Sequence, residues 1–194
     1  GYIATMPKQP HIHDGSDYCL VPPEISVREG VMRADNYDDV YFSCEGGLAE
    51  ARHVFFAGND LPLRMAQNSY LCIAETGFGS GLNLLALMTE MKKFPRLNID
   101  FLSVEAHPLD IDQMAFVHNQ FPELSVHAAE LRKVMPPRWP GQHVVALLDG
   151  RLSLHLLYGA AEKILPGIDF KADCWFLDGF SPAKNLDFWS PKIL

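Results

Sequence analysis

The chain has 194 residues, of which 16 are Lys or Arg and 24 are Asp or Glu, so its formal net charge is −8. Hydrophobic residues make up 48% and charged residues 21%, a balance typical of one globular domain that excludes a disordered or fibrous protein. The acidic balance argues against bulk electrostatic binding of nucleic acid, although it leaves room for a local basic patch. Two clusters of basic residues could each form such a patch: Lys92, Lys93 and Arg96, and Arg132, Lys133 and Arg138. The plainer interpretation of both clusters is surface charge beside helix ends.

The sequence also bears on the cellular compartment. No stretch reaches the roughly 18 uninterrupted apolar residues that a membrane helix requires. Residues 1–8 lack the basic-then-apolar layout of a signal peptide. The four cysteines show no Cys-x-x-Cys spacing, and we expect them in a reducing compartment. The prediction is a cytoplasmic protein without a membrane partner.

Residues 1–37 are expected to form an N-terminal arm. They contain four prolines and show no clear periodicity. His11 and His13 could bind a metal together, but no second pair of ligands follows at finger-like spacing. The preferred interpretation is an exposed arm without a metal site, followed by one domain over residues 38–194.

From residue 38 onward the pattern alternates between strands and helices. Continuous apolar runs are typical of parallel strands that are covered on both faces. Apolar residues at helical spacing predict helices between them. The predicted strands are 39–43, 70–74, 99–104, 144–148 and 172–177, and the predicted helices are 48–56, 82–91, 111–119 and 152–165.

The last four of these strands alternate with helices. This order predicts right-handed βαβ units and an α/β, Rossmann-like, doubly wound sheet. A sheet of this kind usually has further strands after the fourth one. We therefore expect the domain to be truncated at its C-terminus.

Acidic residues stand at or beside the end of each of the four predicted strands: Glu75, Glu105, Asp149 and Asp178. Ligands of open α/β sheets bind outside the carboxyl ends of the strands. Each residue alone is weak evidence, because an acid at a strand end can simply cap the next helix. Their coincidence favours a nucleoside site, in which Glu105 accepts both hydroxyls of an adenosine ribose.

Glycines alternate directly after the strand 70–74, at Gly77, Gly79 and Gly81. Glycine lets the backbone turn tightly and approach a ligand without a Cβ clash. The Gly-x-Gly-x-Gly spacing differs from the Gly-x-Gly-x-x-Gly of dinucleotide folds, which place a pyrophosphate at a helix N-terminus. Glu75 before the loop would repel phosphate and suits a cationic ligand, such as the amino group and sulfonium of S-adenosylmethionine.

Five blocks of the sequence, taken together, point to one family: 39–43 (DVYFS), 47–50 (GLAE), 54–59 (VFFAGN), 75–83 (ETGFGSGLN) and 175–185 (WFLDGFSPAKN). From about residue 38 to the end, the chain resembles the methyltransferase domain of the bacterial bifunctional tRNA enzyme MnmC. The last two blocks are highly specific. Ser80, Ser181 and Leu186 depart from the usual pattern of the family without removing a functional group that we assign to chemistry.

The resemblance implies a Rossmann-like methyltransferase that uses S-adenosylmethionine. Its substrate would be tRNA, in which it methylates the aminomethyl group of 5-aminomethyl-2-thiouridine at the wobble position. In that family a following FAD-dependent oxidase domain supplies the amine, and nothing in these 194 residues matches it. FAD is therefore expected only in a fused or associated domain outside this chain.

The expected site residues fall into three groups. Asp178 is the expected catalytic residue, because a carboxylate at the fourth strand end could accept an amine N–H and take its proton. The expected cofactor-binding residues are Glu75, Gly77, Gly79, Gly81, Asn83, Glu105 and Asp149. The expected substrate-binding residues are Phe180, Pro182, Lys184, Tyr41 and Asn59. Structural roles compete for several of them, as a helix cap at Asp178 or core packing at Phe180.

Two other functional classes remain open at this point. One is a methyltransferase that acts on a small molecule or on a protein. The other is a non-catalytic fragment that binds only the cofactor or tRNA.

Overall fold

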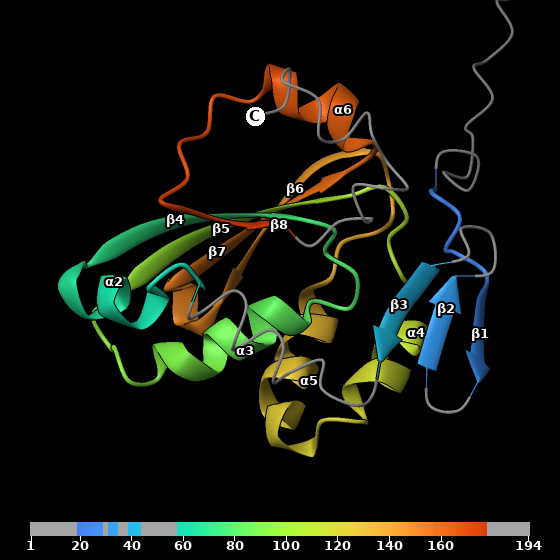
Figure 1. The fold of residues 1–194 in the computed structure, drawn as a ribbon, viewed down its shortest axis with the longest axis horizontal. Helices are drawn as coiled ribbons and strands as arrows, with labels where there is room; N and C mark the ends of the chain where they lie inside the picture. Colours follow the sequence, from blue (N-terminus) through green and yellow to red (C-terminus); the bar gives the residue numbers. More distant parts are fainter. Residues whose placement is uncertain (1–18, 29–30, 35–38, 44–57, 178–194) are drawn as a thin grey trace, which may run out of the picture.

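The computed structural model describes residues 19–28, 31–34, 39–43 and 58–177. Their largest unit is a five-stranded sheet in the order β6-β7-β5-β4-β8, with helices on both faces (Figure 1). A separate three-stranded sheet, β1-β2-β3, stands beside it. The predicted α/β class is confirmed.

Four strands of the large sheet run parallel to one another: β4 (Tyr70–Thr76), β5 (Asn98–Glu105), β7 (Leu152–Tyr158) and β8 (Cys174–Leu177). The chain passes from β4 to β5 to β7 in one direction and then returns to place β8 on the other side of β4. This reversal makes the sheet doubly wound and puts its topological switch point between β4 and β8. Open α/β sheets bind their ligands at such a point.

The β4–β8 pairing joins residues about a hundred positions apart. Ile73 pairs with Cys174, and the backbone N–H of Cys72 donates to Oδ2 of Asp173 at 2.7 Å. These contacts fix β8 at the edge of the sheet, directly before Asp178.

Helices cover the two faces of the sheet unequally. One face packs against α3 (Leu82–Met91), α4 (Ile111–His118) and α5 (Ser125–Val134), which share the larger hydrophobic core with the inward residues of β4, β5 and β7. The other face carries α6 (Ala161–Ile164), which packs on a small apolar cluster. That cluster comprises Leu102, Val104, Leu157 and Ala161. Figure 1 shows α6 on the side of the sheet opposite to α3 and α5.

The predictions for the strand 144–148 and for the helix after it were partly wrong. Residues 144–148 belong to β6 (Gly141–Leu147), which is antiparallel to β7. The predicted helix 152–165 instead begins as β7, followed by the single turn of α6. Leu152, Leu154 and Leu156 alternate with the half-buried Ser153 and His155, which is the period of a strand.

The expected N-terminal arm contains regular structure at residues 25–28 and 31–34. β1 (Ile25–Arg28) and β2 (Val31–Ala34) form an antiparallel sheet with β3 (Asp39–Ser43). The strand expected at 39–43 is confirmed. The predicted domain boundary at 37/38 therefore falls between two paired strands.

Further helices complete the described chain. α2 (Leu61–Gln67) precedes β4 and buries Leu61 and Met65. Three short 3-10 helical turns lie at Pro122–Leu124, Leu148–Gly150 and Leu165–Gly167. Neither α2 nor α5 was predicted, whereas the predicted helix 82–91 is confirmed. The predicted helix 48–56 lies outside the described residues.

Two findings concern the expected compartment. Within the described part of the chain, no helix has the length and apolar character needed to cross a bilayer. Cys19, Cys72 and Cys174 are free thiols.

Candidate functional site

The parallel strands end together at one edge of the sheet. Thr76, Glu105 and Tyr158 are the last residues of β4, β5 and β7, and Glu105 pairs in register with Tyr158. The glycine loop, residues 77–81, follows β4 and leads into α3. The structure therefore brings the glycine loop and Glu105 together at the carboxyl edge, as the sequence predicted.

All three glycines of the loop adopt left-handed backbone conformations. The φ angles are 81° at Gly77, 54° at Gly79 and 78° at Gly81. At Gly81 a Cβ would also lie 2.8 Å from Cζ of Phe78. A larger residue would be strained in conformation here and would collide with the core.

The amides of these glycines are used inside the protein. Gly77 N donates to the Val104 carbonyl at 2.8 Å, and Gly81 N donates to the Phe78 carbonyl at 2.8 Å. Gly79 N donates to Oε2 of Glu105 at 2.9 Å. Donors occupied in this way are not offered to a pyrophosphate, which dinucleotide sites bind through their loop amides. The geometry is in line with a cofactor that lacks phosphate.

Glu105 is almost buried, with 7% of its surface exposed. Besides the bond from Gly79, its Oε1 accepts from the backbone N–H of His107 at 2.7 Å. A carboxylate oxygen can accept a second hydrogen bond, so ribose hydroxyls remain compatible with this arrangement. The ribose contact of Glu105 stays a prediction, and its bond to the glycine loop is an additional role that the sequence did not indicate.

Glu75 lies deeper, with 1% exposed. Its Oε1 accepts from Nδ2 of Asn83 at 2.8 Å, and its Oε2 accepts from Oγ of Ser103 at 2.7 Å. The carboxylate therefore ties β4 to α3 and to β5. Contacts of Glu75 and Asn83 with a cofactor stay predictions.

Among the described residues, two buried oxygens near the ends of β4 and β7 have no hydrogen-bond partner: Oγ1 of Thr76 and Oη of Tyr158. Burial raises the pKa of Tyr158, the nearby Glu105 raises it further, and Arg138 opposes them. Buried polar atoms are normally paired, so these two oxygens are exceptions within the core.

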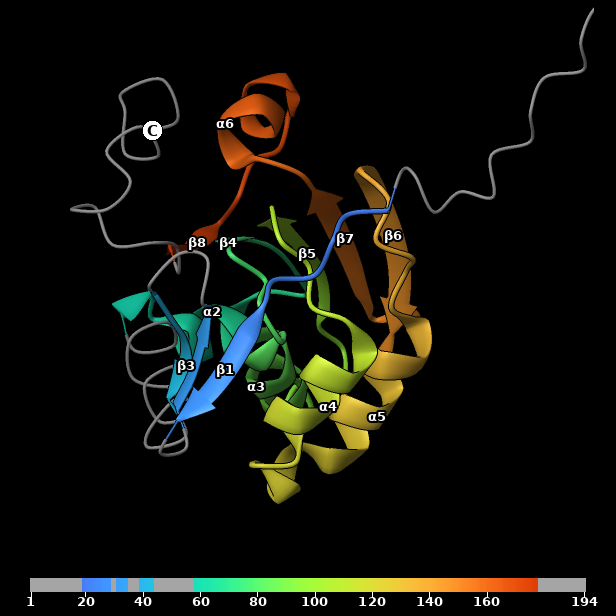
Figure 2. The same ribbon diagram turned by 90° about the vertical axis from the view of Figure 1, so that its right-hand side faces the viewer.

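Residues 19–24 cross the same edge before β1 begins. Figure 2 shows this blue stretch passing from beside β6 to β1. Leu20 N donates to the Arg138 carbonyl at 2.7 Å, and Nε2 of Gln113 donates to the Pro23 carbonyl at 2.9 Å. One guanidinium nitrogen of Arg138 is buried there without a hydrogen-bond partner. Sequence reasoning placed Arg138 only in a surface basic cluster and missed its position at this edge.

Asp149 does not belong to this edge. The turn that contains it joins β6 to β7, where Leu147 pairs with Leu152 at the start of the parallel strands. Because β6 is antiparallel, its end lies at the opposite edge from Glu105. Asp149 is exposed there, so its assignment as a cofactor-binding residue was wrong.

The remaining predicted residues can be placed only in part. Asp178, Phe180, Pro182 and Lys184 lie outside the described residues. Tyr41 lies in the middle of β3, and the structure describes only its backbone. Asn59 precedes α2, and its Nδ2 is 3.5 Å from the carbonyl oxygen of Trp175 in β8. This contact sets the segment before α2 against the edge strand.

A buried histidine outside the predicted set touches the glycine loop. Nε2 of His118, at the end of α4, lies 2.8 Å from the carbonyl oxygen of Ser80. Nη1 of Arg132, in α5, lies 2.8 Å from Nδ1 of the same ring. A single histidine in a predicted helix gave no signal for this role.

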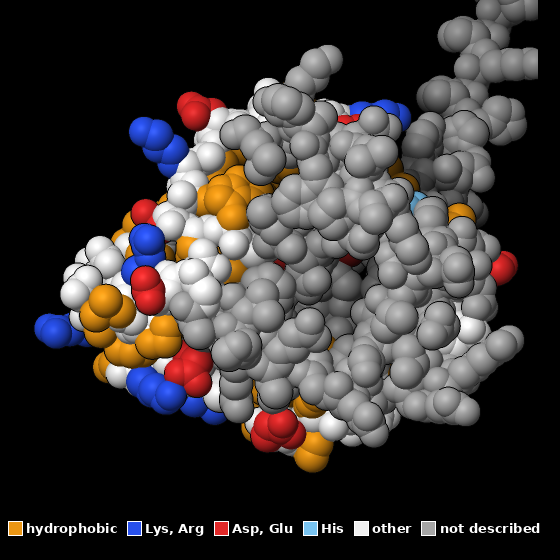
Figure 3. All heavy atoms as spheres, in the orientation of Figure 1, with side chains coloured by type: hydrophobic (Ala, Val, Ile, Leu, Met, Phe, Trp, Pro, Cys, Tyr) orange, Lys and Arg blue, Asp and Glu red, His pale blue; other side chains and the backbone are white. Residues whose placement is uncertain are grey.

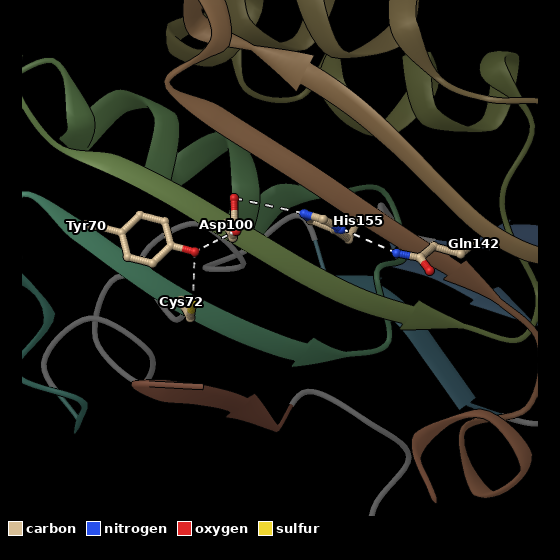
Figure 4. A network of polar contacts seen from close by, with 5 residues as sticks. All are labelled: Tyr70, Cys72, Asp100, Gln142 and His155. Atoms are coloured by element: carbon tan, nitrogen blue, oxygen red, sulfur yellow. Dashed lines mark hydrogen bonds and ion pairs between the residues drawn. The ribbon is translucent and has the colours of Figure 1, made fainter. Parts of the chain in front are cut away.

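A second polar cluster lies elsewhere on the sheet (Figure 4). Oη of Tyr70 donates to Oδ2 of Asp100 at 2.6 Å, and Cys72 contacts the same hydroxyl. Nε2 of His155 lies 3.9 Å from Oδ1 of Asp100, and Gln142 approaches the other ring nitrogen. These residues alternate with the core positions of their strands. Tyr70, Cys72 and Asp100 lie toward the starts of β4 and β5, whereas His155 lies in the middle of β7 and Gln142 lies opposite Leu157. The cluster therefore runs across the sheet, and its contacts are separate from those that hold the glycine loop.

Comparison with known proteins bears on the family and on the fold. Residues 122–194 match a family described as S-adenosyl-L-methionine-dependent methyltransferase. The chain is 45% identical over 176 residues to the tRNA 5-methylaminomethyl-2-thiouridine biosynthesis bifunctional protein MnmC of Ralstonia nicotianae, which covers 90% of this chain and 27% of that protein. The protein of the same name from Azoarcus sp. is 43% identical over 177 residues, 90% of this chain and 28% of that one.

A solved structure extends the likeness to the fold. The crystal structure of MNMC2 from Aquifex aeolicus superimposes with a TM-score of 0.66 at 25% identity, over 88% of this chain and 54% of that one. The resemblance found in the sequence, and with it the Rossmann-like methyltransferase fold, is confirmed. The chain spans about a quarter of the length of the curated relatives it matches.

Proposed function

We propose that this chain, which matches the methyltransferase part of the MnmC proteins over most of its length, methylates the wobble uridine of tRNA from S-adenosylmethionine. The reaction is N-methylation of 5-aminomethyl-2-thiouridine to 5-methylaminomethyl-2-thiouridine. The observation that carries the proposal is a glycine loop with inward-facing amides, held by Glu105 at the switch point of the sheet.

The cofactor part of the proposal rests on the carboxyl edge. Glu105, at the end of β5, would accept the ribose hydroxyls of the nucleoside. Glu75 would favour the cationic end of the cofactor through its charge. Gly77 and Gly79 would let the backbone approach the ligand closely.

The catalytic part rests on Asp178. S-adenosylmethionine would supply an electrophilic methyl group, and most of the rate would come from holding the amine in line with it. Asp178 follows Leu177, the last residue of β8, at the switch point. We assign it to accept an amine N–H, aim the lone pair at the methyl carbon and take the proton that methylation releases.

The tRNA part rests on the relatives, which are named as tRNA 5-methylaminomethyl-2-thiouridine biosynthesis proteins. The expected contacts of the substrate are Phe180, Pro182 and Lys184. Figure 3 shows one face of the molecule, with Lys and Arg side chains interspersed with Asp and Glu over its left-hand part. Two positive charges of the sequence clusters are engaged within the chain, since Arg132 contacts His118 and Lys93 pairs with Glu90. We therefore expect recognition of the modified base and its surroundings to outweigh bulk electrostatic attraction.

The relatives are named bifunctional, and we extend this to the present protein. An FAD-dependent oxidase, fused or associated, would remove a carboxymethyl group and leave the amine that this chain methylates. The two steps would then act on the same nucleoside in succession.

The test is methyl transfer from labelled S-adenosylmethionine to three substrates: tRNA that carries 5-aminomethyl-2-thiouridine, the same tRNA without the modification, and the free modified nucleoside. We expect label only in the first, with the product nucleoside identified by mass spectrometry. Label in proteins or small molecules alone would replace tRNA by another substrate. Cofactor binding in calorimetry without transfer to any substrate would indicate a non-catalytic binding module.

A further inference from the structure

Two side chains hold the glycine loop from opposite sides. Glu105 accepts a hydrogen bond from Gly79 N at 2.9 Å. Nε2 of His118 lies 2.8 Å from the carbonyl oxygen of Ser80, the next residue. The loop is thus anchored through one of its N–H groups and one of its carbonyl groups, between two glycines in left-handed conformations.

The chemistry of its neighbours fixes the proton on His118. Arg132 has only donors, so Nδ1 of the imidazole must accept from its Nη1. The Ser80 carbonyl only accepts, so Nε2 must carry the hydrogen and donate. Both contacts require the same neutral tautomer, with the hydrogen on Nε2.

The anchor is itself rigid. α4 begins with a capping box, in which Gln113 N donates to Asp110 Oδ1 at 2.8 Å and Asp110 N donates to Gln113 Oε1 at 2.9 Å. His118 ends this helix with 2% of its surface exposed, and Ser80 is 7% exposed. A carbonyl buried to this extent has little water to replace a lost partner.

We propose that His118 is a positioning residue for the cofactor: by holding the Ser80 carbonyl, it keeps the glycine loop in the conformation that binds S-adenosylmethionine. The inference rests on the proposed function. His118 touches neither of the reacting atoms in this role, and Arg132 acts one step further away by orienting the ring.

The expected consequence follows from the population of the competent loop. Without the bond, the left-handed glycines let the loop adopt other conformations, and the apparent Kd rises by the factor by which the competent fraction falls. The typical net value of one hydrogen bond corresponds to a roughly 2- to 13-fold weaker affinity. Saturating cofactor selects the competent loop again, so kcat should stay close to wild type while KM for S-adenosylmethionine rises.

Three variants of the natural full-length protein test this. His118→Leu removes both contacts. His118→Gln offers an amide N–H to Ser80 and an amide oxygen to Arg132, and should restore the loop. His127→Leu is the matched control, because His127 is a buried imidazole of α5 whose Nδ1 lies 3.7 Å from Oε2 of Glu130 on the same helix. Binding of S-adenosylmethionine is measured by calorimetry, and loop opening by hydrogen exchange at the Gly79 and Gly81 amides.

We expect weaker binding and faster exchange for His118→Leu, near-wild-type values for His118→Gln, and unchanged binding for His127→Leu. If His118→Leu does not fold, Arg132→Met loosens the ring while sparing the Ser80 bond, and a small rise in Kd is expected. Equal effects of the His118 and His127 changes, or unchanged binding in His118→Leu and Arg132→Met, would overturn the positioning role. A wild-type protein that binds no S-adenosylmethionine would overturn the proposed function, and this inference with it.

Discussion

Oε2 of Glu105 accepts a hydrogen bond from Gly79 N at 2.9 Å, although the two residues lie 26 positions apart, Gly79 in the loop after β4 and Glu105 at the end of β5. The residue expected to bind ribose therefore also shapes the loop that approaches the cofactor. Loss of the carboxylate should affect the site twice, through the lost contact and through the released loop.

Glu105→Gln tests this double role. An amide can accept from Gly79 or from His107 through its single oxygen, so one backbone donor loses its partner. We expect S-adenosylmethionine binding to weaken by about 1.5–3 kcal/mol in calorimetry. Glu130→Gln is the control. Oε1 of Glu130 accepts from the backbone N–H of Leu148 at 2.7 Å, and this bond lies at the edge of the sheet opposite to Glu105. Equal affinity of both variants would remove Glu105 from the cofactor site.

Gly81→Ala tests the steric need for glycine at the start of α3. The new Cβ would combine a left-handed φ of 78° with a 2.8 Å approach to Cζ of Phe78. We expect a loss of about 1–3 kcal/mol in the free energy of unfolding, measured by chemical denaturation.

Gly150→Ala is the matched control for that change. Gly150 has a φ of 84°, and nothing lies within 4 Å of a Cβ built on it. It carries the conformational cost without the collision, so it should destabilise less than Gly81→Ala. Equal losses would mean that the contact with Phe78 is relieved by a cheap shift.

Acidification should reduce stability partly through His118. Burial lowers its pKa from the ordinary value of 6.5, the Ser80 carbonyl opposes this, and Arg132 adds to it. The unfolded chain therefore takes up a proton near pH 6.5 that the folded chain still excludes, and the stability from this group is lost as pH falls below that value. Denaturation of the wild type and His118→Gln at pH 7.5 and 5.5 measures the difference.

We expect the wild type to lose more stability than His118→Gln over this interval. The pKa of His127 is also lowered, by burial and by Lys92 against Glu130, and it contributes in both proteins. Identical losses would show that His118 titrates alike in the folded and unfolded chains.

Asp178→Ala tests the catalytic assignment. We expect a folded protein whose turnover on aminomethyl-bearing tRNA falls by roughly 10²–10⁴, with its affinity for S-adenosylmethionine kept. Asp173→Asn, directly before β8, is the control for an acidic residue that flanks this strand and accepts from Cys72 N. Near-wild-type turnover in Asp178→Ala would reduce this carboxylate to a helix cap.

Most of the fold could be predicted because its signals are local. The apolar runs at β4 and β5 and the helical spacing of α3 each lie within ten residues. The predicted helix 152–165 was wrong at its start because the leucines there fit helical spacing as well as the alternation of a strand. Only the pairing of β7 with β5 decides between the two. Asp149 was lost from the site for the same reason, since the direction of β6 depends on its partner.

The site divides in the same way. Glu75, Glu105 and the glycines could be found because they stand at strand ends. Their partners could not: Ser103 reaches Glu75 from the next strand, and His118 reaches Ser80 from a helix 38 positions later. A single histidine or serine in such a position has no pattern around it, and its role exists only once the strands have been aligned.

The pairing of β8 with β4 has a consequence for the order of events during synthesis. β4 gains β5 as a neighbour soon after it is made, but its other edge stays open until β8, about a hundred residues later, has left the ribosome. An edge that waits so long can pair with a foreign strand, which makes the nascent chain vulnerable to aggregation. β8 is made after β4, β5 and β7, so the contact between Glu105 and the glycine loop can form before that pairing does.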